Sequence, residues 1–283
     1  MEKVSVVVSD LDNTLFDWFH MWYHSFSTLL DELSARSGID KETLIAAIRK
    51  VHQKHGTSEY AFLLQELPLL RGDKDNDPSD LYAGVMEAAR EASEAHLELY
   101  PTVRETLEYL KSLGCCVVAY TESMGYYTKP RIMKLGLDGL LDYIYSPADH
   151  DFPQGAYKTD HQLKKTVHCH TPEGERKPNP RVLLDILADI GASARETIYV
   201  GDSLMKDIAM AQDAGVTDVL AQYGSVVGKE AYALLRAVSH WTEADVVRER
   251  EINEGRTVIP TCVLDKNFGQ LLDLFKFDLF KHE

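Results

Sequence analysis

Short apolar runs alternate with amphipathic segments along most of the chain. The first run, at 4–9, is rich in β-branched residues and predicts a buried strand. Four later runs have the same character, and the stretch 256–264 indicates a further short strand. Parallel strands are covered on both faces and therefore read as continuous apolar runs, as these do. The four later runs lie at 115–123, 141–147, 196–203 and 216–224.

Between 17 and 98 the apolar residues repeat at helical spacing instead, and no strand pattern occurs. The segment 19–38 ends at Gly38, a residue type that commonly follows the last turn of a helix. The next segment begins after Asp40, a favourable N-cap, and stops at Gly56. We therefore predict an all-helical unit over 17–98, inserted between the first and second strands.

The remaining residues, 1–16 and 99–283, alternate strands with helices. This order predicts an α/β fold with a parallel sheet and right-handed crossovers. Ligands of such sheets bind beyond the carboxyl ends of the strands. Asp10, Thr121 and Asp202 each stand where an apolar run stops. We expect these three residues to lie along one rim of the sheet.

The composition is that of an ordinary soluble globular protein. The chain has 283 residues, of which 45% are hydrophobic and 27% charged, enough for one large domain or two moderate ones. Its formal net charge of -15 would repel a phosphate backbone, so binding of a nucleic acid polymer is not expected. A small anionic substrate remains compatible with this charge where a local cation offsets it. The composition does not predict an oligomeric state.

The four cysteines include no CxxC pair, so a disulfide framework is not expected. The N-terminal residues do not resemble a signal peptide, and no apolar run approaches the roughly 18 residues that a membrane span needs. These features predict a cytoplasmic protein without a membrane partner.

Four short polar motifs follow predicted elements in a defined order. They are "DLDNT" at 10–14, "YTES" at 120–123, "KPNP" at 177–180 and "GDSLMKD" at 201–207. Each alone is also explained by a turn, a strand-end threonine, a surface lysine or a helix N-terminus. Together they resemble the haloacid dehalogenase superfamily, and specifically its phosphatase branch. That resemblance implies a Rossmann-like catalytic core at 1–16 and 99–283, with an inserted helical cap domain at 17–98.

Asp10 and Asp12 can bring two carboxyl groups to one reaction, because residues two apart in an extended chain face the same side. One carboxylate can attack as a nucleophile and form an aspartyl-phosphate. The other can protonate the leaving oxygen and then activate water. The resemblance assigns the first role to Asp10 and the second to Asp12. We expect the phosphoryl group to be bound by Thr121, Glu122, Ser123 and Lys177, of which Thr121 and Lys177 also count as catalytic.

The charges of the site call for a metal ion. Asp10, Asp12, Asp202 and Asp207 carry four negative charges when all are ionised, and Lys177 offsets one of them. A divalent cation, with Asp12 protonated, brings the site to neutrality. Oxygen ligands and a phosphate substrate favour Mg²⁺ over Zn²⁺. By resemblance, the ligands are the Asp10 carboxylate, the Asp12 backbone carbonyl and the Asp202 carboxylate, while Asp207 supports the ion through water or orients Lys177.

These motifs predict a magnesium-dependent phosphatase that hydrolyses the phosphate monoester of a small metabolite through an aspartyl-phosphate. A phosphomutase remains an alternative because it would use the same residues. A non-catalytic binding module with a silent site is the alternative from a different class. A dehalogenase is disfavoured, because its chemistry does not need the acid that Asp12 supplies. The fold itself does not identify the substrate.

Two connecting segments carry further expectations. In "KHGTSEY" at 54–60 we predict that His55, Thr57 and Ser58 contact the substrate, the alternative being a plain helix connector. The segment 147–177 is predicted to be irregular and polar, adding either substrate contacts or an oligomer surface. Its "HCH" at 168–170 is interpreted as part of that loop rather than as a zinc site, because its spacing fits no common zinc pattern.

Overall fold

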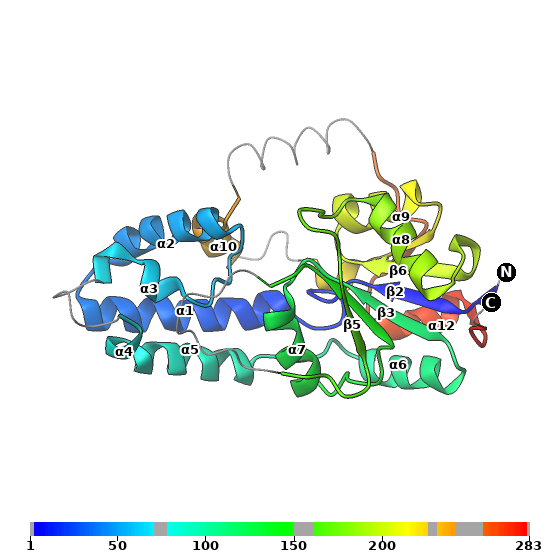
Figure 1. Ribbon diagram of the computed structural model, residues 1–283, viewed down its shortest axis with the longest axis horizontal. Helices are drawn as coiled ribbons and strands as arrows, with labels where there is room; N and C mark the ends of the chain where they lie inside the picture. The colour runs from blue at the N-terminus through cyan, green and yellow to red at the C-terminus, as the bar shows by residue number, and fades with distance from the viewer. Residues whose placement is uncertain (1–2, 71–77, 150–160, 226–230, 242–256, 282–283) are drawn as a thin grey trace. The chain divides into compact units, whose positions relative to one another are not determined.

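The computed structural model describes residues 3–70, 78–149, 161–225, 231–241 and 257–281 (Figure 1). The chain forms two compact units. One, here called the sheet unit, comprises Met1–Asp17, Glu98–Ser225 and Arg256–Glu283. The other, the helical unit, comprises Trp18–Leu97 and Val226–Gly255.

The sheet unit is built on seven parallel strands in the order β5-β4-β3-β2-β6-β7-β8. This arrangement confirms the predicted Rossmann-like α/β fold. A separate parallel pair joins β1 (Lys3–Val4) to β9 (Lys276–Phe277). The seven strands are β2 (Val6–Ser9), β3 (Cys116–Tyr120), β4 (Tyr143–Ser146), β5 (Val167–His170), β6 (Thr197–Gly201), β7 (Thr217–Ala221) and β8 (Cys262–Leu264).

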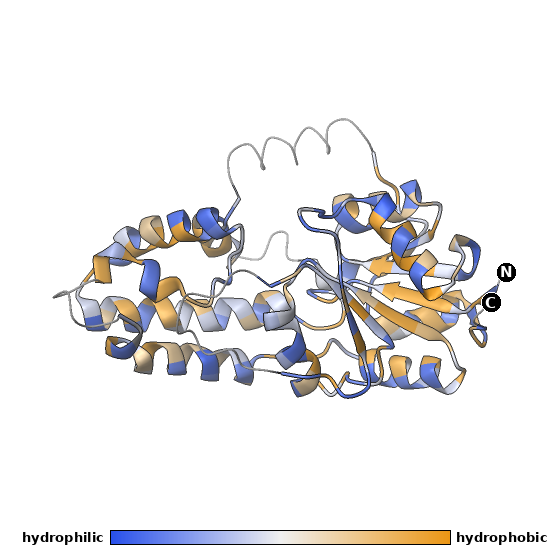
Figure 2. Ribbon diagram, viewed as in Figure 1, coloured by the Kyte–Doolittle hydropathy of each residue, from blue (hydrophilic) through white to orange (hydrophobic). Residues whose placement is uncertain are grey.

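Helices cover both faces of this sheet, with α8 and α9 on one side and α6 and α12 on the other (Figure 1). Figure 2 shows the strands between them coloured mainly as apolar, as expected for a sheet that is buried on both sides. The helices are α6 (Val103–Ser112), α7 (Gly125–Lys134), α8 (Pro180–Ile190), α9 (Ala209–Asp213) and α12 (Leu271–Leu274). Short helical turns are Ala194–Glu196, Leu204–Ile208, Gln222–Gly224 and Phe268–Gln270.

The start of α8 is fixed by local sequence. The Asn179 side chain accepts hydrogen bonds from the backbone amides of Arg181 and Val182, so two amides that lack helical partners are satisfied. Pro180 occupies the first turn, where its missing N–H costs nothing. The helix ends at Gly191 with a φ of 72°, a left-handed conformation that glycine adopts without strain. The "KPNP" motif therefore sets where α8 begins.

The central strand β2 directs the chain toward the rim. All four of its residues are buried, and it pairs with β3 on one side and β6 on the other. Ser9 lies opposite Ala119 of β3 and Val200 of β6. The residues that follow these three strands therefore emerge at the same edge, as the sequence predicts for Asp10, Thr121 and Asp202.

The helical unit packs around a long first helix. Phe19, Trp22 and Leu33 of α1 are buried together with Leu44 and Ile48 of α2. No helix among the described residues is long and apolar enough to span a membrane. The helices of this unit are α1 (Trp18–Ser37), α2 (Lys41–His55), α3 (Leu63–Glu66), α4 (Pro78–Leu81), α5 (Ala83–Ala95) and α10 (Tyr232–Val238), with a 3₁₀ turn at Pro68–Leu70.

The segment 147–177 differs from the irregular loop that the sequence predicts. Val167–His170 forms β5, an edge strand in which Val167 lies opposite Tyr143 and His170 opposite Ser146. Both ends of β5 are exposed, so it lacks the continuous apolar run that marks a central strand. The "HCH" sequence is therefore part of a strand, not of a loop. Residues 150–160 lie outside the described residues.

The placement of α10 also differs from the expected assignment of 99–283 to the sheet unit. Its residues Leu235 and Val238 are buried in the core of the helical unit. The Val238 carbonyl accepts a hydrogen bond of 2.7 Å from Nδ1 of His52 on α2. Apolar packing on α2 thus draws this late segment of the chain into the helical unit, and the expected helix at 230–250 is described only as far as residue 241.

Candidate active site

The loop after β2 holds Asp10 in a buried position at the carboxyl end of the sheet. The Asp10 amide donates to the Val200 carbonyl at 2.8 Å, which continues the pairing with β6. The loop then turns sharply at Asn13, whose φ is 61°. Gly224 allows this turn, because a Cβ atom there would lie 1.7 Å from the Asn13 carbonyl oxygen. The Thr14 hydroxyl donates to Oδ2 of Asp10 at 3.3 Å.

Lys177 is the cation of the site. Its side chain is only 2% exposed, and its Nζ donates to Oδ1 of Asp10 at 2.6 Å and to Oδ1 of Asp207 at 2.9 Å. It also lies over the rings of Tyr120 and Tyr199, 4.8 and 5.5 Å from their centroids. Burial alone would lower the pKa of Lys177, but the charges of Asp10 and Asp207 outweigh it and raise that pKa well above its ordinary value. The ammonium therefore stays charged.

The carboxylates of Asp10, Asp202 and Asp207 form a cluster in which one oxygen from each lies within 4.8 Å of the other two. Burial raises the pKa of Asp10 to about 7; Lys177 opposes this rise, and the charges of Asp207 and Asp12 add to it. Burial, followed by the charges of Asp207 and Asp10, also raises the pKa of Asp202 well above its ordinary value. More negative charge is gathered here than Lys177 can balance. Hard oxygen donors with such a charge excess fit Mg²⁺.

Asp207 connects this cluster to the strand beneath it. Its Oδ1 accepts from Lys177 and, at 2.9 Å, from the Tyr199 hydroxyl, while Oδ2 accepts from the Ser203 amide at 3.1 Å. Gly201 makes room for it, because a Cβ atom there would lie 2.4 Å from the Asp207 Cγ. These contacts favour the second of the two expected roles for Asp207, the orientation of Lys177.

The Asp12 side chain faces a different group of residues. Its Oδ2 accepts from the Thr121 hydroxyl at 3.3 Å, and its Oδ1 lies 3.7 Å from an Nη1 atom of Arg131 on α7. Asp12 is not part of the cluster formed by the other three aspartates. The two carboxyl groups of "DLDNT" thus have different partners.

The residues after Thr121 shape the rim through polar contacts. The Ser123 amide donates to Oγ1 of Thr121 at 3.0 Å. The Glu122 carboxylate accepts from the Lys206 ammonium at 2.6 Å and from the Lys177 amide at 3.2 Å. Burial would raise the pKa of Glu122, but Lys206, with the charges of Lys177 and Arg176, outweighs burial and the pKa is lowered. The Glu122 side chain therefore braces the loop that carries Lys177, which leaves the Glu122 amide and the Ser123 hydroxyl as groups of 122–123 that could hold a phosphoryl oxygen.

The predicted substrate residues of 54–60 lie in the helical unit and have partners there. His55 stacks on Tyr60 with 3.7 Å between ring centroids, and its Nε2 lies 2.8 Å from Oε1 of Glu66. Ser58 is buried, with its hydroxyl 3.0 Å from Nδ1 of His240. The Thr57 hydroxyl accepts from the Glu59 amide at 3.2 Å and can still donate its proton. Thr57 is thus the member of the three best suited to a ligand contact.

Two residues of the site carry no signal in the sequence. Arg131 is one basic residue among several on α7, and only the fold places it beside Asp12. Tyr199 reads as an ordinary strand residue of "ETIYVGDS", yet it contacts both Lys177 and Asp207. Tyr199 lies two residues before Gly201, and this position could point to the site only once "GDSLMKD" has been recognised as a site motif.

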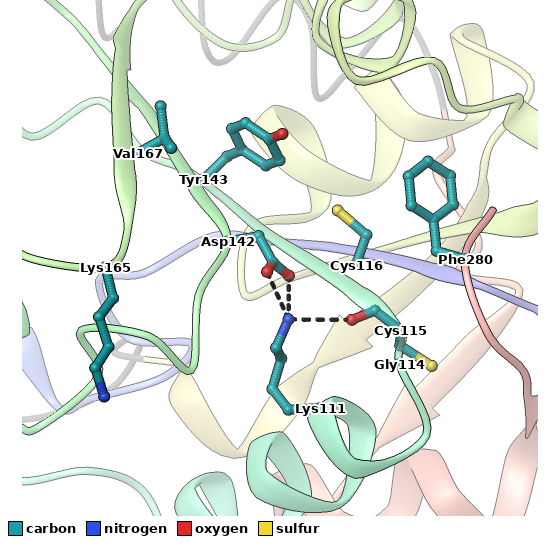
Figure 3. Close-up of a pocket in the computed structure, with 9 residues that line it drawn as sticks. All are labelled: Lys111, Gly114, Cys115, Cys116, Asp142, Tyr143, Lys165, Val167 and Phe280. Atoms are coloured by element: carbon teal, nitrogen blue, oxygen red, sulfur yellow. Dashed lines mark hydrogen bonds and ion pairs between the residues drawn. The ribbon is translucent and has the colours of Figure 1, made fainter. Parts of the chain in front are cut away.

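A pocket of the sheet unit lies away from these residues. Figure 3 shows Lys111 and Asp142 paired across it, with 2.5 and 2.6 Å between the ammonium and the two carboxylate oxygens. It is lined by the residues that begin β3, β4 and β5, such as Cys116, Tyr143 and Val167. Ligands of parallel sheets bind at the opposite, carboxyl ends of the strands. The geometry therefore favours the rim around Asp10 as the active site.

His168 and His170 of β5 contact other side chains of the sheet unit. Nε2 of His168 lies 2.8 Å from the Ser146 hydroxyl on β4, and its ring lies 4.7 Å from that of His170. Burial lowers the pKa of His168 to about 4. Neither of the groups of three potential metal ligands found among the described residues includes this pair.

Comparison with known proteins assigns the family. Residues 4–215 match the model of the haloacid dehalogenase-like hydrolases. The chain is 24% identical to a glyceraldehyde 3-phosphate phosphatase of Methanopyrus kandleri over 78% of its own length and 85% of the relative's. It is also 24% identical to a phosphoglycolate phosphatase of Pseudomonas syringae pv. syringae, over 91% and 79%.

Among solved structures, a 2-haloacid dehalogenase from Pseudomonas syringae pv. tomato shares the fold with a TM-score of 0.55 at 19% identity, covering 96% of this chain and 97% of that one. The family model spans most of the chain and includes all four motifs of the rim. This protein therefore belongs to the haloacid dehalogenase-like hydrolase family.

Proposed function

We propose that this hydrolase is a magnesium-dependent phosphatase that cleaves the phosphate monoester of a small metabolite through an aspartyl-phosphate on Asp10. The observation that carries the proposal is the constellation at the rim. A buried Asp10 lies against Lys177, and Asp12 stands two residues further on with different partners. The phosphatase names of the relatives at 24% identity support the reaction class.

In the first step, a carboxylate oxygen of Asp10 forms a bond to phosphorus as the bond from phosphorus to the leaving oxygen breaks. Asp12 gives its proton to that leaving oxygen, so the product departs as a neutral alcohol. Lys177, held 2.6 Å from Asp10, offsets the charge shared by the nucleophile and the phosphoryl group. The Thr121 hydroxyl, the Glu122 amide and the Ser123 hydroxyl hold phosphoryl oxygens.

In the second step, Asp12 takes a proton from water, whose oxygen forms a bond to phosphorus while the bond to Asp10 breaks. Asp12 ends this step protonated, as it began the first. In the structure the Thr121 hydroxyl donates to Asp12 at 3.3 Å. A bound phosphoryl oxygen would compete with Asp12 for that hydroxyl proton. Phosphoryl binding thereby releases Asp12 to act as the acid and base.

The cluster of carboxylate oxygens fits a magnesium ion, which the carboxylates of Asp10 and Asp202 and the Asp12 backbone carbonyl would hold, with Asp207 orienting Lys177 beside them. When bound, Mg²⁺ supplies two positive charges that let a phosphate dianion approach the carboxylates. The chain's own part is to gather the oxygen donors and to exclude further negative charge. Lys206 contributes by neutralising Glu122 near the rim.

The relatives suggest a class of substrate. The two named above act on glyceraldehyde 3-phosphate and on phosphoglycolate, both short carbon chains that carry one phosphate and a second polar group. We propose a substrate of this class. A panel of phosphorylated sugars, nucleotides and short organic acids, scored by released inorganic phosphate, tests the proposal. Conversion of a sugar phosphate to its isomer without phosphate release would assign a phosphomutase. No turnover of any panel member, nor of a generic aryl phosphate assayed beside them, would assign a silent binding module.

Asp12→Asn tests the acid and base. The amide cannot transfer the proton, so we expect kcat for the best metabolite to fall about 10²–10⁴-fold. The loss should be smaller for an aryl phosphate, whose leaving group needs less protonation. Steady-state kinetics on both substrates give the comparison. Asp273→Asn, the same change at an exposed residue, is the matched control. Equal losses on the two substrates would contradict the role of Asp12 in leaving-group protonation.

The helical unit is proposed to act as the cap that contacts the leaving group, because the core motifs handle only the phosphoryl group. Thr57→Val keeps the shape of the side chain and removes its hydroxyl. We expect kcat/KM for the best metabolite to fall by an amount that corresponds to a loss of about 1–3 kcal/mol in transition-state stabilisation. The kcat/KM for a small aryl phosphate should change little. His55→Ala and Ser58→Ala belong to the same test, with thermal unfolding measured beside them, since both residues have partners inside the helical unit. Losses of equal size on both substrates would reject this loop as a specificity element.

A further inference from the structure

Three histidines gather at one end of the helical unit, and none of them belongs to the motifs of the rim. His20 and His24 lie one turn apart on α1, so they project from the same face of that helix. His96 stands at the C-cap of α5, which packs along α1. One nitrogen from each of the three rings can be chosen so that all lie within 4.8 Å of one another.

The rings are ordered against one another. Those of His24 and His96 stack with 3.8 Å between centroids and an interplanar angle of 6°. The ring of His20 meets both edge-on, at 4.5 Å from His24 and 5.1 Å from His96. The three rings therefore form one compact group.

The tautomer of one ring is set by a neighbouring carbonyl. Nδ1 of His96 lies 2.8 Å from the Ala92 carbonyl oxygen, which can only accept, so Nδ1 carries the hydrogen. Nε2 is therefore the lone-pair nitrogen of His96. A histidine that donates one ring N–H to a backbone carbonyl is the usual arrangement of a metal ligand.

From this geometry we propose that His20, His24 and His96 bind one divalent transition-metal ion, with Zn²⁺ as the ion to test. Neutral imidazole nitrogen suits zinc and its neighbours in the series and is a poor ligand for Mg²⁺. A tetrahedral Zn²⁺ about 2.0–2.1 Å from each nitrogen would hold the three nitrogens about 3.3 Å apart. A ring nitrogen binds a metal in the plane of its ring, so the stacked rings of His24 and His96 would turn out of their parallel arrangement and the exposed His20 would rotate toward them, with water in the fourth position.

The triad lies close in sequence to two of the four points at which the chain passes between the two units. The helical unit begins at Trp18 and its first segment ends at Leu97. The amide of Asp17 donates to the Glu98 carbonyl at 3.2 Å just outside these limits. A metal ion on the triad would link the first turns of α1 to the end of α5. It would thereby hold together the two ends of the segment Trp18–Leu97.

Zinc binding to the intact protein tests this site. After chelation and removal of the chelator, the protein is titrated with Zn²⁺ in excess Mg²⁺, with bound zinc measured by equilibrium dialysis and elemental analysis. We expect one Zn²⁺ per chain, a rise of a few degrees in Tm at saturation, and at least an about tenfold weaker affinity in His20→Gln and in His24→Gln. Co²⁺ in place of Zn²⁺ should give the strong visible absorption of a tetrahedral site, lost in the same variants.

Two control proteins separate the triad from other possible ligands. Asp202→Asn removes a ligand of the acidic cluster, and His168→Gln with His170→Gln removes the ring pair of β5. Both should bind zinc as the wild type does. Because His20 is exposed, His20→Gln keeps the test valid even where a change at His24 alters folding. Wild-type zinc affinity in His20→Gln and His24→Gln, or no bound zinc in the wild type once Mg²⁺ is in excess, would overturn the proposal. The test does not depend on the phosphatase assignment, since its readout is binding.

Discussion

Replacing Asp10 by Asn should reduce phosphate release to background while leaving a folded protein. An amide oxygen is too weak a nucleophile to displace the leaving oxygen, so no covalent intermediate forms. Asn also removes one of the two carboxylates that hold Lys177. The loss should be the same for metabolites and for aryl phosphates, because without the nucleophile neither kind of leaving group can be displaced. This uniform loss distinguishes Asp10→Asn from Asp12→Asn.

Two measurements check the role of Asp10. Steady-state phosphate release is compared with that of Asp273→Asn, which changes the net charge equally at an exposed position. Rapid acid quench of the wild type should trap a phosphoenzyme that hydroxylamine cleaves, as an acyl phosphate requires. Circular dichroism and Tm establish that the variant is folded. A hydroxylamine-sensitive phosphoenzyme in Asp10→Asn would show that another residue is the nucleophile.

Removal of divalent metal should likewise abolish turnover, and Mg²⁺ alone should restore it. Without the cation, the carboxylates of Asp10, Asp202 and Asp207 face an approaching phosphate dianion with only Lys177 to offset them. Activity is measured after exhaustive chelation and again during titration with Mg²⁺. Asp202→Asn should need at least about tenfold more Mg²⁺ for half-maximal activity, since it loses one proposed ligand.

The two metal experiments are independent of each other. Restoration by Mg²⁺ should proceed equally well in His24→Gln, because the three histidines are not proposed to take part in the reaction. Full turnover in exhaustively chelated protein would reject the magnesium hypothesis. Restoration by Zn²⁺ but not by Mg²⁺ would also contradict the oxygen-ligand argument.

The central strands could be predicted from the sequence, because the apolar run that marks each of them is a local pattern. Strands β2, β3 and β6 are buried on both faces, so each appears as an unbroken apolar run. The edge strand β5 escaped detection for the opposite reason, since one side of its backbone has no neighbouring strand and its end residues are exposed. The joining of α10 to the helical unit depends on packing between residues such as His52 and Val238, which are far apart in the sequence.

The same distinction applies to the site. The aspartates of the rim stand at the ends of predicted strands, so the topology of a parallel sheet was enough to bring Asp10, Thr121 and Asp202 together. Arg131 and Tyr199 could not be found in this way, because their contacts arise from the direction in which one helix and one strand residue point. Likewise, His20, His24 and His96 become a group only when α1 and α5 pack side by side.

The closeness of the two chain segments at 16–17 and 98–99 bears on the history of the fold. Phe16 and Leu99 form an antiparallel bridge, and the Tyr100 amide donates to the Leu15 carbonyl at 3.0 Å. A chain without the intervening helices could therefore be closed here by a tight hairpin turn, and the sheet unit would lose no strand. Such a junction lets an insertion be gained, lengthened or exchanged without disturbing β2 or the residues that follow it. If the helical unit contacts the leaving group as proposed, new specificity can evolve in the helices while the residues after β2 stay unchanged.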